Sequence, residues 1–122
     1  MKLTLSFPRQ ERLKSRKSID AIFRSGKRVH VNEWRAIFQF RPSPGIQVGV
    51  GAPSRNFKKA VDRNRIKRLL REAYRLDQHH WKASLIQQQG LDIFFLFTGK
   101  TLPDLTATRE ALSALYEKIF TA

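Results

Sequence analysis

The feature that most constrains the fold of this 122-residue chain is the segment 58–75. Its basic residues and its apolar residues both recur with the period of an α-helix, on opposite sides. The segment holds eight Lys or Arg residues in eighteen positions. On a helix turning about 100° per residue, one set of apolar side chains spans roughly a third of the circumference: Ile66, Leu69, Leu70, Ala73 and Leu76. The nearly opposite side carries Arg63, Asn64, Lys67, Arg68, Arg71 and Arg75. We therefore expect an amphipathic helix that packs one face on a core.

The basic face of this helix could be only a solvated surface, as many charged helix faces are. Two features favour an anionic partner instead. Arg outnumbers Lys in the segment, and the planar guanidinium suits phosphate oxygens. Only two acidic residues, Asp62 and Glu72, interrupt the basic run, so the face does not neutralise itself.

The positive charge of the chain is concentrated in its first two-thirds. The net charge is +14, and residues 1–76 hold 20 Lys or Arg against 5 Asp or Glu. Residues 83–122 hold three basic and four acidic residues. This asymmetry favours a polyanion-binding surface. A membrane surface is less favoured, because the apolar side of the basic helix lacks Trp and Phe.

Composition predicts one soluble domain, residues 1–122, with residues 1–14 as an extended arm. The chain is 41% hydrophobic and contains no Cys, which excludes disulfides and thiolate metal sites. No apolar run approaches the roughly 20 residues that span a membrane, and the first residues lack the apolar stretch of a signal peptide. We expect a cytoplasmic protein.

The remaining pattern predicts an α+β sandwich. A short helix should begin at the N-cap Ser15 and end at Gly26. Alternating strands follow from Lys27, at 34–41 and at 47–52, and the turn at 42–45 predicts that the last two form a hairpin. Gly49 and Gly51 would leave one face open to a ligand backbone, or mark a bulge or bend. A second short helix up to residue 89, a covered strand at 91–98 and a final helix after Asp104 complete the chain.

Catalytic groups are scarce in the sequence. The three His residues, at positions 30, 79 and 80, include no pair at metal-ligand spacing, and the ten carboxylates are scattered. Gly49-x-Gly51 lacks the Gly-Lys-Ser/Thr of a phosphate-binding loop. We expect no metal bound by the protein alone and no catalytic residue.

The run Ala60-Val61-Asp62-Arg63-Asn64-Arg65-Ile66-Lys67-Arg68-Leu69-Leu70-Arg71-Glu72-Ala73-Tyr74-Arg75 resembles the characteristic helix of the bacterial ribonuclease P protein family. Other parts of the chain fall in the family's order: Phe7-Pro8-Arg9, Arg12-Leu13, the short helix with Phe23 and Gly26, Val48-Gly49-Val50 and the terminal helix. The resemblance implies a two-layer α/β sandwich with one mixed four-stranded sheet and a basic crossover helix, similar to the ribosomal protein S5 domain 2-like fold.

The resemblance also implies a function. In the family, a large catalytic RNA holds Mg²⁺ and removes the 5′ leader of precursor tRNA, while the protein binds that RNA and the leader. The partners would be the ribonuclease P RNA and precursor tRNA, with Mg²⁺ held mainly by RNA and substrate. A purely structural RNA-binding protein, ribosomal or for assembly, is the alternative. A protein-only nuclease lacks the carboxylates it would need.

Two groups of site residues follow from the resemblance. The expected contacts to the catalytic RNA are Arg63, Asn64, Arg65, Lys67, Arg68, Arg71, Arg55 and Lys59. The expected leader cleft is lined by Phe23, Ile19, Arg35, Ile37 and Asn56. Phe23 would stack on leader nucleotides, although packing in the core is the other interpretation, and Ile19 stands where the family has a second aromatic.

Overall fold

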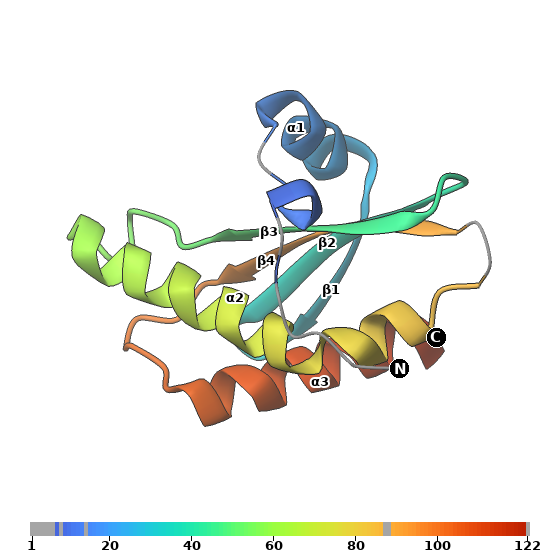
Figure 1. Ribbon diagram of the computed structural model, residues 1–122. Coiled ribbons are helices and arrows are strands. Elements are labelled where there is room, and N and C mark those ends of the chain that lie inside the picture. Colours follow the sequence, from blue (N-terminus) through green and yellow to red (C-terminus); the bar gives the residue numbers. More distant parts are fainter. Residues whose placement is uncertain (1–6, 8, 14, 87–88, 122) are drawn as a thin grey trace.

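The computed structural model describes residues 7, 9–13, 15–86 and 89–121. They form one mixed four-stranded sheet with three α-helices, so the expected α+β class is confirmed (Figure 1). The elements are a 3-10 turn at Arg9–Glu11, α1 (Arg16–Ser25), β1 (Lys27–Val31), β2 (Trp34–Arg41), β3 (Gly45–Gly51), α2 (Ala60–Ala83), β4 (Gly90–Phe97) and α3 (Leu105–Thr121). Helices α2 and α3 cover one face of the sheet, and α1 stands on the other.

The described part of the predicted N-terminal arm lies along the outer edge of β3. Residues 1–6, 8 and 14 of that arm fall outside the described residues. Arg12 forms a parallel bridge with Val48, and the amide of Leu13 donates to the Val48 carbonyl at 2.8 Å. The segment is therefore tied to the sheet at Leu13, whose side chain is buried.

Helix α1 begins and ends where the sequence predicts. The amide of Ser18 donates to the side-chain oxygen of Ser15 at 3.4 Å, which caps the helix. Gly26 follows the last turn with an extended backbone (φ −75°). A Cβ at this position would lie 2.6 Å from the Ile22 carbonyl oxygen, so close approach to the helix end requires the glycine.

The predicted hairpin between the second and third strands is wrong. The strand order is β1-β2-β4-β3, and β4 lies between β2 and β3, antiparallel to β2 and parallel to β3. Apart from Asp92, strand β4 is apolar on both faces, and it is covered by α1 on one side and by the layer of α2 and α3 on the other. The turn at 42–44 instead crosses the start of β4, where a Cβ on Gly90 would lie 2.0 Å from the Ser43 carbonyl oxygen.

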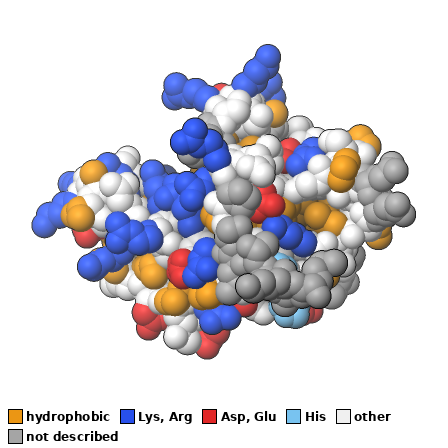
Figure 2. Space-filling view, in the orientation of Figure 1, with side chains coloured by type: hydrophobic (Ala, Val, Ile, Leu, Met, Phe, Trp, Pro, Cys, Tyr) orange, Lys and Arg blue, Asp and Glu red, His pale blue; other side chains and the backbone are white. Residues whose placement is uncertain are grey.

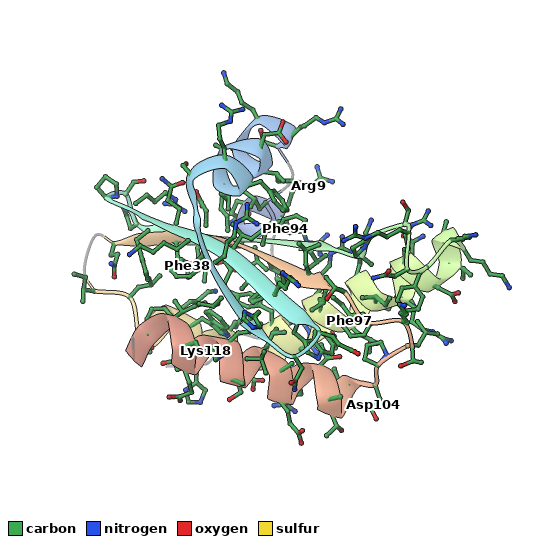
Figure 3. All side chains as sticks on the ribbon, turned by 180° about the vertical axis from the view of Figure 1, so that it is seen from behind. Arg9, Phe38, Phe94, Phe97, Asp104 and Lys118 are labelled. Atoms are coloured by element: carbon green, nitrogen blue, oxygen red, sulfur yellow. The ribbon has the colours of Figure 1, made fainter. Side chains whose placement is uncertain are left out.

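The main core lies between the sheet and the pair α2 and α3. Alternate residues of β2 and β4 point into it, among them Phe38 and Phe97, whereas Phe94 points to the α1 side (Figure 3). The stripe predicted on α2 is confirmed at its buried positions Ile66, Leu70 and Ala73.

Helix α2 is longer than the sequence predicts. It continues to Ala83 in place of a separate short helix, and residues 87–88 lie outside the described residues. Trp81 explains the extension, because it is 2% exposed and its ring meets Phe95 at 5.5 Å between centroids. Gln78, fully buried, interrupts the apolar pattern and made this turn hard to predict.

A second, smaller cluster fills the space between the sheet and α1. Its buried members are Leu13, Ile22 and Ile37. Phe94 lies beside them, directly opposite Gly49 in the β3–β4 register. A Cβ on Gly49 would lie 2.5 Å from this ring and one on Gly51 2.9 Å from it. The two glycines therefore make room for Phe94, which corrects both sequence interpretations of them.

Candidate nucleic-acid interface

The exposed face of α2 carries a group of cations without acidic partners. Arg65, Lys67, Arg68 and Arg71 form no ion pair among the described residues. In the space-filling view, blue side chains gather over α2 and stand out from α1, whereas red carboxylates show along the lower side, near α3 (Figure 2). The helix therefore concentrates positive potential on one side of the molecule.

The N-terminal segment adds to this face. A hollow of about 420 Å³ on the surface is lined by Phe7, Arg12, Asn64, Lys67, Arg68, Arg71, Glu72 and Arg75. The Phe7 ring packs on Tyr74 at 5.4 Å, and the Arg12 guanidinium stands 5.2 Å from the Phe7 centroid. The helical pattern alone did not assign Arg12 to the site. No local pattern indicates it, because the contact joins two segments that are distant in the sequence.

The electrostatics of the hollow favour an anion. Partial burial and the charge of Arg12 lower the pKa of Arg71, so the two cations disfavour each other. Arg75 differs, because it donates two hydrogen bonds to Glu72, at 3.0 and 2.5 Å, which raise its pKa and lower that of Glu72. Beneath them, burial raises the pKa of Tyr74, and the charge of Glu11 adds to that effect. A bound phosphate would relieve the repulsion at Arg71.

The beginning of α2 and the loop before it hold the remaining predicted RNA contacts. Arg55 and Lys59 are exposed, and the N-cap Lys59 gives the helix no side-chain cap. The positive end of the helix dipole therefore adds to their charge. Arg63 has a structural task that the sequence pattern did not indicate, because its Nη1 donates to the carbonyls of Phe57 and Lys58 at 2.7 and 2.8 Å. All eight predicted residues lie on α2 or on this loop.

The predicted leader cleft is partly closed. Ile37 is 2% exposed in the cluster beneath α1, so its side chain serves mainly packing and offers a leader nucleotide almost no surface, which corrects that assignment. Phe23 and Ile19 are half-buried against the same cluster, and the Phe23 ring meets Phe94 at 5.2 Å. Arg35 is exposed. Asn56 donates its amide to the Thr98 carbonyl at 2.8 Å, which ties the loop before α2 to the end of β4.

The carboxylates and imidazoles of the described residues are dispersed or paired. Nowhere among them do three or more His, Cys, Asp or Glu residues lie together as potential ligands. Four of the carboxylates are paired with cations, in Arg41–Asp92, Arg75–Glu72, Lys82–Glu11 and Arg109–Asp77. None of the helices in the described part of the chain is long and apolar enough to span a bilayer.

Comparison with known proteins decides the family. The model of the family described as Ribonuclease P matches residues 7–120, nearly the whole chain. The chain belongs to the ribonuclease P protein family. A similar protein is the ribonuclease P protein component of Porphyromonas gingivalis strain W83, 32% identical over 113 residues, or 89% of this chain and 82% of the relative. The ribonuclease P protein component of Escherichia coli is 30% identical over 116 residues, which cover 95% of this chain and 89% of that relative.

Solved structures agree in fold. The ribonuclease P protein of Staphylococcus aureus has a TM-score of 0.72 at 17% identity, covering 89% of this chain and 94% of that one. The ribonuclease P protein of Thermotoga maritima has a TM-score of 0.70 at 24% identity, and the match covers 88% of this chain and 96% of that one. At these identities the structures support the fold alone. Family membership gives the chain a subunit role in ribonuclease P and in tRNA processing.

Proposed function

We propose that the chain docks on the ribonuclease P RNA through the exposed face of α2 and leaves the cleavage of precursor tRNA to that RNA. The observation that carries the proposal is the group Arg65, Lys67, Arg68 and Arg71, which has no acidic partner among the described residues and is joined by Arg12 across a hollow. Unneutralised guanidinium groups on a rigid helix are suited to the phosphates of a folded RNA.

The chemistry of the side chains supports catalysis by the RNA. A protein nuclease needs carboxylates that hold metal ions or a positioned general base. The described carboxylates are scattered or paired with cations, and none lies in a cluster of potential ligands. Mg²⁺ would be held by the RNA and the substrate, and this chain would supply positive charge around them.

The other face of the sheet is suited to the single-stranded leader. Phe23 of α1 presents part of its ring, Arg35 is exposed on β2, and Asn56 lies in the loop that leads to α2. An aromatic platform with neighbouring cations is the usual arrangement for unpaired nucleotides. The complex would act in the cytoplasm on precursor tRNA.

A reconstitution assay tests the proposal. Purified protein, transcribed ribonuclease P RNA and a precursor tRNA are mixed at low Mg²⁺, and each component is omitted in turn. We expect the protein to stimulate cleavage by the RNA and to cleave nothing alone. Arg68→Ala should reduce the stimulation at limiting protein concentration, while Lys100→Ala, in the exposed loop after β4, should match the parent.

Two outcomes would contradict the proposal. Cleavage by the protein without RNA would make it a nuclease. RNA binding without any stimulation of cleavage would leave only a structural RNA-binding role.

A further inference from the structure

We propose that Arg28, His30 and Arg35 form a second anion site, which binds a backbone phosphate of single-stranded RNA at the edge of the sheet. The inference rests on the proposed function, since the leader is the strand expected on this face. It adds two residues, Arg28 and His30, to Arg35, which the sequence had already indicated there.

The strand register brings the three side chains together. In the β1–β2 ladder His30 lies opposite Arg35, and Arg28 lies opposite Ile37. Directly opposite residues of an antiparallel pair share a face, so all three cationic or titratable side chains lie on the α1 side of the sheet. They line one hollow of about 80 Å³, together with Val29, Ala36, Ile37 and Leu96.

Charge and exposure suit an anion. Arg28, His30 and Arg35 are exposed above the buried Ile37. None of the ion pairs among the described residues involves them. Two guanidinium groups and an imidazole therefore line one hollow that has no carboxylate in its lining, which is a donor set for phosphate oxygens.

The site is held in place from two sides. The Nη2 of Arg28 donates to the Phe23 carbonyl at 2.6 Å, and its guanidinium stands 6.0 Å from the centroid of the Phe23 ring. On the other side, Nζ of Lys118 donates to the backbone carbonyl of His30 at 2.7 Å, which fixes the edge strand to α3. The arginine is therefore positioned before a ligand arrives, which lowers the entropy cost of binding.

The surroundings favour a nucleotide over a lipid headgroup. Phe23 offers a partly exposed ring next to Arg28, so a base could stack there while its phosphate meets the three basic side chains. A membrane-binding site would add exposed apolar residues around the cations. The large exposed hydrophobic residues, Val61, Ile86 and Leu102, do not line this hollow.

The test measures substrate binding by the reconstituted complex. Precursor tRNA with a leader and mature tRNA without one are compared for the parent, for Arg35→Gln, and for Arg28→Gln combined with Arg35→Gln. We expect the double variant to weaken precursor binding about tenfold, and to reduce the salt slope by about 0.7 because one phosphate is no longer bound. Mature tRNA binding and assembly with the RNA should not change.

Lys27→Gln is the matched control, because Lys27 is the exposed neighbour of Arg28 on β1 and lies opposite Phe38 on the other face. An equal weakening in this control, or for mature tRNA, would overturn the site in favour of a general charge effect. Unchanged precursor binding in both variants would also overturn it. The single variant Arg35→Gln controls for misfolding, because the Arg35 side chain makes no hydrogen bond among the described residues and its loss should leave the fold intact.

A second arm separates this inference from the proposed function. A single-stranded leader oligonucleotide and inorganic phosphate are each titrated into the free protein. If the parent fails to assemble with the RNA, the proposed function fails, yet weaker oligonucleotide binding by the double variant would still support the site. If inorganic phosphate binds and the oligonucleotide does not displace it, the assignment to RNA is wrong.

Discussion

Arg71 and Arg75 lie one turn apart on α2 and have opposite environments. Arg71 faces Arg12, and burial together with that charge lowers its pKa. Arg75 is paired with Glu72, which raises its pKa. A lowered pKa means that the folded protein disfavours the charged form of Arg71 at every pH below that value. Arg71 is therefore the cation of this face whose charge the folded state is expected to favour least.

The two arginines should therefore respond oppositely to neutralisation. Arg71→Gln should raise the melting temperature by about 1–2 °C, because the partial burial of a charge and the repulsion from Arg12 are both removed, and should weaken RNA binding. Arg75→Gln should lower the melting temperature, because Glu72 is left without this partner. Thermal unfolding at low salt measures both, and added salt should shrink both shifts. A fall in stability for Arg71→Gln would show that packing by its side chain outweighs the repulsion.

Individual residues were the hardest to predict from sequence. The helical spacing was sufficient to predict the helix that carries most of the expected RNA contacts. It could not show that Arg63 would bond to the loop carbonyls, or that Arg12 would join the face from a distant segment. Both depend on contacts between parts of the chain that local periodicity does not register.

At the scale of elements, a side chain of β4 determines which residues β3 can carry at two positions. Gly49 and Gly51 face Phe94, and the ring occupies the space that side chains on β3 would need. This arrangement lets Phe94 meet Phe23 and support α1. The glycines are thus required by packing across the parallel pair.

Gly49→Ala should destabilise the protein by about 1–3 kcal/mol, because the new methyl group overlaps Phe94 and lies 3.2 Å from the Leu13 carbonyl. Denaturant unfolding measures the decrease in the free energy of unfolding. The same substitution in a Phe94→Leu background should cost less, because the smaller side chain leaves room for the methyl group. Gln47→Ala, on the same face of β3, is the control. Equal decreases in the two backgrounds would show that the ring is not the obstacle.

Element boundaries were predicted better than element neighbours. The alternation at 34–41 matches β2, and the helix expected after Asp104 is α3, which buries Leu112, Leu115 and Ile119. The false hairpin arose because nothing within 34–52 indicates that a later strand will separate β2 from β3. The two-sided apolar pattern of β4 carried that information, since such a strand needs the centre of a covered sheet.

The whole molecule separates its charges. Cations gather over α2 and α1, and carboxylates near α3 (Figure 2). The sequence predicted this division, because residues 1–76 carry the excess of Lys and Arg. A polyanion would therefore approach in one orientation, with α2 foremost, and the described carboxylates near α3 would discourage the reverse.

The salt dependence of binding to the ribonuclease P RNA tests the central claim most directly. The logarithm of the binding constant is measured against the logarithm of salt concentration for the parent, Arg65→Gln, Arg68→Gln and the control Lys100→Gln. Each variant on α2 should weaken binding and flatten the slope by about 0.7–0.9 for each phosphate that its side chain no longer neutralises, while the control keeps the parental slope. Parental affinity and slope in both α2 variants would contradict the claim that this face docks on the RNA.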